Sequence, residues 1–188
     1  LTYEKLDEEE REQYEDEFCE DDGLVDHIPP EKINTYIFNR DTVDIMISDL
    51  MNHGIKHKNG NHVGKTIIFA QNKRHAKYII ERFDVLYPQY KGAFCKLVVC
   101  DEPYAEKNLE DFKKPDEYPF ITVTVDMLET GVDVPEITNL VFAKKVYSRI
   151  KFEQMIGRGT RLCENLFGEG RDKKEFYICL LYTSPSPR

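Results

Sequence analysis

Apolar positions along the chain alternate between short β-branched runs and segments with a helical period. The runs predict strands at residues 66–70, 94–100, 120–125, 138–143 and 175–179. The periodic segments predict helices at residues 41–53, 73–86, 104–112 and 148–158. Because strands and helices alternate, we expect an α/β fold: a mostly parallel sheet with helices on both faces.

The charge is distributed unevenly and divides the chain. The formal net charge is −9, but residues 1–31 hold 14 acidic and 2 basic side chains, a net charge of −12. We predict that residues 1–31 form an acidic helical extension and a connector, because Gly23 and Pro29-Pro30 interrupt the charged run. Residues 32–179 form the predicted lobe. Their mildly basic balance permits contact with DNA but does not by itself argue for it.

Composition narrows the class of protein. No apolar run approaches about 18 residues and no signal segment opens the chain, so we expect a cytoplasmic protein without a membrane partner. The five cysteines contain no Cys-x-x-Cys pair and the five histidines are not grouped with them. This distribution argues against a disulfide framework and a metal site.

The strongest candidate chemistry lies between residues 154 and 161. Gln154, Arg158 and Arg161 are spaced four and three apart, so a helix would place them on one face. Arginine holds phosphate oxygens bidentately and stays charged. Gly157 and Gly159 each cost about 1 kcal/mol relative to Ala in a helix, which predicts a close approach by a phosphate chain or a neighbouring backbone. The alternative is a basic helix that faces solvent.

A glycine and a carboxylate precede this segment. Gly131 and Asp133 follow the predicted strand 120–125 in a Gly-x-Asp-x-Pro pattern. The loop and the two arginines together predict a site that handles phosphate groups.

Polar residues also follow the strand at 66–70. Gln71 and Asn72 would lie at the carboxyl edge of the sheet, where open α/β sheets bind ligands. Lys73 begins the next helix, where its charge opposes the helix dipole, and a nearby phosphate would offset that cost. The alternative is a lysine that faces solvent.

A second phosphate motif fails on spacing. Gly64-Lys65-Thr66 is similar to the end of a phosphate loop, but Asn59 stands where such a loop needs glycine, and a strand follows instead of a helix. We therefore interpret the triplet as the start of a strand. The alternative, a phosphotransferase that uses this triplet, predicts ATP binding that Lys65→Ala abolishes.

Three segments resemble motifs of superfamily 2 helicases and translocases. Residues 65–72 resemble motif IV, residues 126–133 resemble motif V, and Gln154-x-x-Gly157-Arg158-x-x-Arg161 resembles motif VI. The amino-acid sequence of motifs V and VI most closely resembles that of the motor subunit of type I restriction enzymes. The resemblance extends over about residues 1–179. It implies a fragment that is the second RecA-like lobe of a DNA translocase, a three-layer α/β sandwich.

The resemblance implies roles for individual residues. Three would be catalytic. Arg158 and Arg161 would reach the nucleotide phosphates across the lobe interface, with one of them acting as an arginine finger, and Gln154 would position the attacking water or couple it to motion. Three would contact the nucleotide or brace motif VI: Gly131, Asp133 and Gly157. Four would contact nucleic acid: Gln71, Asn72, Lys73 and Thr124. Val125 stands where many relatives carry a motif V threonine.

The resemblance also implies parts and partners outside this chain. The chain has neither a phosphate loop nor an Asp-Glu-x-[His/Asp] box, so ATP and Mg²⁺ would be held mainly by a first lobe. The partners would be double-stranded DNA, an N-terminal nuclease, and modification and specificity subunits, and the fragment alone would be inactive. The alternatives are a lobe of a DNA repair or RNA helicase, and a non-catalytic interaction domain in which both arginines are dispensable.

Residues 180–188 fit nothing before them. Their sequence matches what a common transposase sequencing adaptor encodes, so we predict an assembly artefact that is not part of the fold. The alternative is a natural tail rich in Pro and Ser.

Overall fold

The structure is a computed structural model that describes residues 40–99, 102–125, 133–146 and 148–181. The predictions for residues 1–31, for Gly131 and for residues 182–188 lie outside the described residues. Most of the predicted strands and helices fall inside them.

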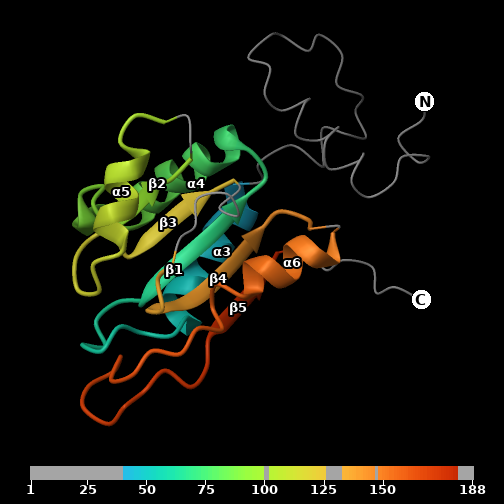
Figure 1. The fold of residues 1–188 in the computed structure, drawn as a ribbon. Helices are drawn as coiled ribbons and strands as arrows, with labels where there is room; N and C mark the ends of the chain where they lie inside the picture. Colours follow the sequence, from blue (N-terminus) through green and yellow to red (C-terminus); the bar gives the residue numbers. More distant parts are fainter. Residues whose placement is uncertain (1–39, 100–101, 126–132, 147, 182–188) are drawn as a thin grey trace, which may run out of the picture.

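Five parallel strands form one sheet (Figure 1). In chain order they are β1 (Lys65–Ala70), β2 (Cys95–Leu97), β3 (Ile121–Thr124), β4 (Ile137–Ala143) and β5 (Tyr177–Leu180). Their order across the sheet is β2-β3-β1-β4-β5. The helices are α3 (Arg40–His53), α4 (Lys73–Leu86), the 3₁₀ turn η2 (Pro88–Tyr90), α5 (Ala105–Phe112) and α6 (Arg149–Ile156).

Two apolar clusters cover the two faces of the sheet. Ile68 of β1 belongs to a cluster with Val43 of α3 and Ile79 of α4. The next residue, Phe69, belongs to the opposite cluster, with Phe112 of α5 and Met155 of α6. Because successive side chains of a strand point to opposite faces, α3 and α4 cover one face and α5 and α6 the other (Figure 1). The predicted parallel sheet with helices on both faces is confirmed.

The end of α6 and the end of β5 differ from the predicted boundaries. The helix predicted at 148–158 ends at Ile156, because two glycines follow and the chain turns there. The last strand reaches Leu180, whose backbone pairs with Phe142. The first residue of the segment 180–188 therefore takes part in the sheet, since ladder pairing uses the backbone and accepts almost any side chain.

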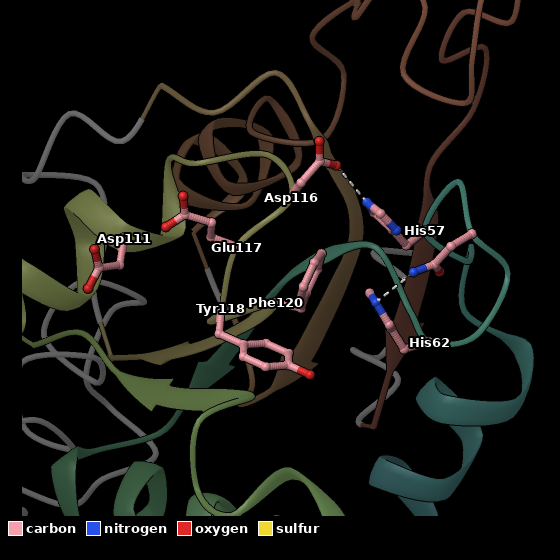
Figure 2. Close-up of a pocket in the computed structure, with 8 residues that line it drawn as sticks. His57, His62, Asp111, Asp116, Glu117, Tyr118 and Phe120 are labelled. Carbon is pink, nitrogen blue, oxygen red and sulfur yellow. Dashed lines mark hydrogen bonds and ion pairs between the residues drawn. The ribbon is translucent and has the colours of Figure 1, made fainter.

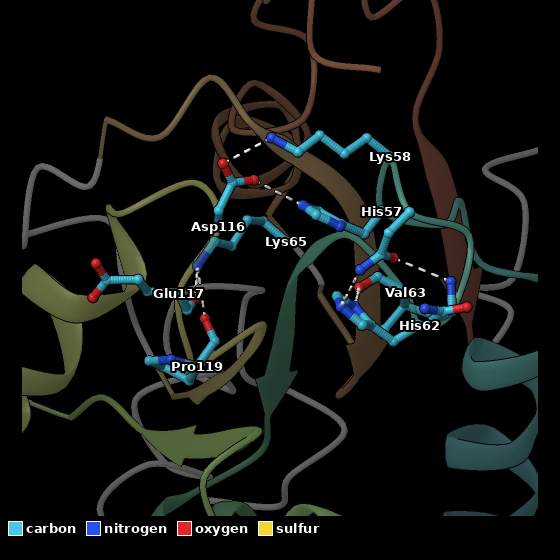
Figure 3. A network of polar contacts seen from close by, with 10 residues as sticks. His57, Lys58, His62, Val63, Lys65, Asp116, Glu117 and Pro119 are labelled. Atoms are coloured by element: carbon cyan, nitrogen blue, oxygen red, sulfur yellow. Dashed lines mark hydrogen bonds and ion pairs between the residues drawn. The ribbon is translucent and has the colours of Figure 1, made fainter. Parts of the chain in front are cut away.

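Lys65 is buried at the start of β1, with 2% of its surface exposed. Its Nζ donates hydrogen bonds to the backbone oxygens of Glu117 and Pro119, both at 2.8 Å (Figure 3). The ammonium also lies 5.1 Å from the ring centre of Phe112 and 4.6 Å from that of Phe120, within cation–π range. Burial lowers the pKa of Lys65 to about 8.

These contacts give Gly64-Lys65-Thr66 a structural role. The amine ties β1 to the segment that enters β3, and the triplet leads into a strand, as the spacing predicts. Gly64 is small because a Cβ there would lie 2.5 Å from Oγ1 of Thr138. Among the described residues, Lys65 begins a strand and not a helix, so no helix N-terminus follows it to receive a phosphate.

The buried lysine makes stability depend on pH. Its folded-state pKa of about 8 lies below the ordinary value of 10.5, so between these two pH values the unfolded chain binds more protons than the folded chain. The free energy of unfolding contributed by Lys65 therefore rises across this window, by up to about 3 kcal/mol. We expect the wild type to gain stability relative to Lys65→Met from the lower to the upper end of the window, measured by urea denaturation. A constant difference between the two proteins would contradict this pKa.

Candidate functional site

The predicted catalytic segment follows α6 and turns away from the helix axis. Ser148 caps α6, since its side chain accepts the N–H of Lys151 at 3.4 Å. At the other end the N–H of Gly159 reaches the oxygen of Ile156 at 2.8 Å, which closes a tight turn. The prediction that Gln154, Arg158 and Arg161 share one helix face is therefore wrong. Only Gln154 lies in α6, where it is exposed, while half-buried Arg158 lies in the turn and exposed Arg161 beyond it.

Arg161 forms an ion pair with Asp133. Nη1 of Arg161 lies 2.5 Å from Oδ1 of Asp133, and the side chains are 45% and 58% exposed. Asp133 precedes β4 and Arg161 follows α6, so the pair joins the described end of motif V to motif VI. For Asp133 the sequence predicted either a contact with the nucleotide or a bracing of motif VI. The ion pair with Arg161 provides a physical basis for the bracing role.

The close approach predicted at the glycines occurs at Gly159, and a side chain makes it. A Cβ on Gly159 would lie 2.6 Å from Cδ2 of Phe176 and 3.0 Å from Cδ1 of Leu140. A Cβ on Gly157 would instead meet the backbone oxygens of its own helix at 3.2 and 3.3 Å. Gly159 therefore lets the turn pack on the sheet, and its smallness needs no phosphate to explain it.

The predicted nucleic-acid residues gather at the carboxyl edge of β1 and β3. Thr124 pairs with Phe69, so the ends of the two strands lie side by side, and Gln71 and Asn72 directly follow the last residue of β1. Thr124 is 1% exposed, and its hydroxyl has no hydrogen-bond partner among the described residues.

The turn from β1 into α4 is built around His75. Asn72 caps α4, with its Oδ1 accepting the N–H of His75 at 2.8 Å. The N–H of Gln71 donates to Nδ1 of His75 at 3.3 Å. Burial lowers the pKa of His75 to about 4, which keeps the ring neutral and Nδ1 able to accept. Sequence reasoning missed His75, although a histidine three residues after an Asn cap falls at the first turn of the helix.

Lys73 already has an acidic neighbour. Its Nζ lies 3.0 Å from Oε1 of Glu102, and Nζ of Lys77 lies 2.7 Å from the same oxygen. Hydrogen bonds from Lys77 and Lys73 lower the pKa of Glu102. The positive charge of Lys73 at the start of α4 is unfavourable to the helix dipole, and the carboxylate of Glu102 offsets it. The sequence had suggested a phosphate for this role.

A recess of about 570 Å³ lies at the opposite, amino edge of the sheet (Figure 2). Its wall includes stacked rings of His57 and His62, 5.0 Å apart, and the ring of Phe120. Asp116 at its rim is held by Nε2 of His57 at 3.0 Å and by Nζ of Lys58 at 2.7 Å (Figures 2 and 3). None of the predicted site residues that the structure describes lines this recess. Across the residues that the structure describes, no group of three or more His, Cys, Asp or Glu side chains could hold a metal ion.

The sequence of the chain is similar to a known protein family and to individual proteins. The profile of the helicase conserved C-terminal domain matches residues 42–163. The chain is 43% identical over 107 residues to the Type I restriction enzyme EcoKI endonuclease subunit of Escherichia coli (strain K12), a match that covers 53% of this chain and 9% of that protein. It is 31% identical over 111 residues to the Type I restriction enzyme EcoAI endonuclease subunit of Escherichia coli, covering 57% of this chain and 14% of that protein. The chain therefore spans a small part of the curated relatives it matches.

Solved structures show the same fold. A fragment of a type I restriction enzyme subunit from Vibrio vulnificus YJ016 matches with a TM-score of 0.64 and 24% identity, covering 83% of this chain and 29% of that one. Domain 2 of the DEAD-box helicase Mss116p matches with a TM-score of 0.54 and 19% identity, covering 75% and 50%. At these identities the likeness shows the fold alone, and the predicted RecA-like architecture is confirmed. No helix within the described ranges is long and apolar enough to cross a membrane.

The packing of Gly159 generates a stability prediction. Gly159→Ala places a methyl group against the Phe176 ring, so we expect it to lower the free energy of unfolding by about 1–3 kcal/mol. Gly157→Ala is the matched control, because its backbone is already right-handed helical and its Cβ contacts are longer. Urea denaturation of the three proteins measures both changes. An equal loss in both variants would contradict the assigned contact.

Proposed function

We propose, because the chain belongs to the helicase conserved C-terminal domain family, that it is the second motor lobe of an ATP-dependent DNA translocase of a type I restriction-modification system. The support is its 43% identity to one type I endonuclease subunit and 31% to another. The intact protein would carry a first lobe and an N-terminal nuclease, and would work in the cytoplasm with modification and specificity subunits.

The Asp133–Arg161 ion pair is the observation that carries the catalytic part of this proposal. A guanidinium has five N–H donors, and Asp133 engages one end of the fork in Arg161. Donors remain for phosphate oxygens, while the carboxylate fixes the direction of the side chain. ATP with Mg²⁺ would supply the transferring phosphoryl group and would be held mainly by a first lobe. Arg161 and Arg158 would stabilise the negative charge that develops during the transfer.

The remaining predicted residues fit supporting roles. Gln154 is exposed on α6, one turn before Arg158, where it would orient the attacking water. Gly157 keeps a side chain away from the same surface. Gly131 keeps its proposed nucleotide contact, but it lies outside the described residues.

Double-stranded DNA is the proposed polymer substrate, and the carboxyl edge of β1 and β3 is its proposed contact. Gln71, Asn72 and Thr124 lie at this edge, and Lys73 starts α4 beside them. The hydroxyl of Thr124 is buried and has no hydrogen-bond partner among the described residues, so it would be available to accept or donate a hydrogen bond at the DNA backbone. Lys73 would exchange its pairing with Glu102 for a phosphate.

Mutation of the two arginines in the full-length gene product tests the catalytic proposal. We expect Arg158→Ala and Arg161→Ala each to lower DNA-stimulated ATP hydrolysis by roughly 10³-fold or more, with ATP binding retained, because arginine fingers act on the transition state. Arg171→Ala, in an exposed loop of the same lobe, is the control. Hydrolysis near the wild-type rate in both variants would favour a non-catalytic interaction domain.

The salt dependence of DNA binding tests the proposed contact of Lys73. We expect Lys73→Gln in the full-length protein to weaken binding of different DNA sequences equally and to reduce the slope of log affinity against log salt by about 1, as loss of one phosphate contact does. Lys77→Gln is the matched control, since it removes the other lysine that pairs with Glu102. An unchanged slope for Lys73→Gln, or the same decrease for Lys77→Gln, would contradict this contact. A preference for RNA over DNA would favour the alternative of an RNA helicase.

A further inference from the structure

Lys173 is buried in a segment whose sequence is that of a polar loop. Only 4% of its surface is exposed, although it lies between α6 and β5 in the run Arg171-Asp-Lys-Lys174. Burial lowers the pKa of Lys173 to about 8. Taking an ammonium group out of water is costly unless acceptors replace the water, so the burial of this side chain indicates a specific partner.

That partner is the backbone of the segment that enters β4. Nζ of Lys173 donates to the backbone oxygen of Pro135 at 3.1 Å. The backbone N–H of Lys173 donates to the oxygen of Cys163 at 2.9 Å. One residue thus joins two stretches of chain that are far apart in sequence.

Both stretches belong to the candidate catalytic site. Pro135 follows Asp133 by two residues, and Cys163 follows Arg161 by two residues. At the surface of the site, the exposed Asp133–Arg161 ion pair links these two segments. Lys173 makes a second, buried link between the same two segments.

We propose that Lys173 is a positioning residue that sets the place of Arg161 relative to Asp133, an inference that rests on the proposed catalytic role of Arg161. An exposed ion pair contributes little energy by itself because solvent screens it and both side chains lose freedom. The buried link restrains the two backbones, and the ion pair then selects one direction for the guanidinium. A displacement of about 1 Å at a catalytic group costs up to roughly 10²-fold in rate.

The test compares Lys173→Met with Lys174→Met in the full-length protein. Methionine keeps most of the length and volume of lysine and removes the donor, and Lys174 is the exposed neighbour in the same segment. We expect Lys173→Met to lower kcat for DNA-stimulated ATP hydrolysis by roughly 10- to 100-fold with KM for ATP unchanged, and Lys174→Met to match the wild type. Equal kcat values in the two variants would overturn the proposal.

A double mutant separates positioning from general destabilisation. If Lys173 acts through Arg161, then adding Lys173→Met to Arg161→Ala causes no further loss of kcat. Losses that multiply would show that Lys173 acts independently of Arg161 and would overturn the proposal. If Lys173→Met does not fold, Lys173→Gln, which keeps a shorter donor, takes its place in the same comparison.

Hydrogen exchange tests the Lys173–Pro135 hydrogen bond directly and needs no ATP. The N–H of Ile137 donates to the oxygen of Val134 at 3.2 Å, next to Pro135. We expect this amide to exchange faster in Lys173→Met than in Lys174→Met, and equal rates would count against the link. Arg161→Ala alone tests the catalytic role on which this inference rests: if this variant leaves hydrolysis unchanged, the role of Arg161 in the proposed function fails. An inactive Arg161→Ala beside a normal Lys173→Met would overturn only the positioning role.

Discussion

The structure depends on the complete burial of its central strand. β1 pairs with β3 on one side and β4 on the other, and all six of its residues are buried. Because its side chains alternate between two faces, each face needs an apolar cover, which α3 and α4 supply on one side and α5 and α6 on the other. Parallel neighbours cannot be joined by hairpins, so every connection crosses a face and the loops collect at the two edges of the sheet.

Three buried polar side chains at or near the amino edge each donate a hydrogen bond to a backbone oxygen that is distant in sequence. Lys65 binds the oxygen of Pro119, Asn139 binds that of Ile55 at 3.1 Å, and Lys173 binds that of Pro135. Each bond joins a loop to a segment at the start of a strand. A buried amine or amide without an acceptor would be destabilising by a few kcal/mol or more, so these side chains specify which loop lies beside which strand.

The sequence predicted the fold well because the fold rests on local periodicity. The helix at 73–86 matches α4 at both ends, since an Asn cap begins it and an apolar stripe continues through it. The site was predicted less well because its geometry depends on contacts distant in sequence. Nothing in the spacing of Gln154 and Arg161 reveals that the helix ends at Ile156 or that Gly159 lies close to Phe176. Burial of Lys173 was equally hidden, because a lysine in a Gly-rich polar run normally faces water.

Because α6 ends at Ile156, two segments of the chain position Arg161 instead of one. On a helix, Arg161 would be placed by α6 alone. Beyond the turn it is placed by two segments, its own and the one that carries Asp133. The exposed pair is worth only about 0–1 kcal/mol, which is enough to bias the direction of a guanidinium and too little to prevent its transfer to a phosphate. In its proposed role, Arg161 would engage nucleotide in each cycle, and it would then combine this weak restraint at its tip with the firmer restraint that the buried Lys173 places on the backbone.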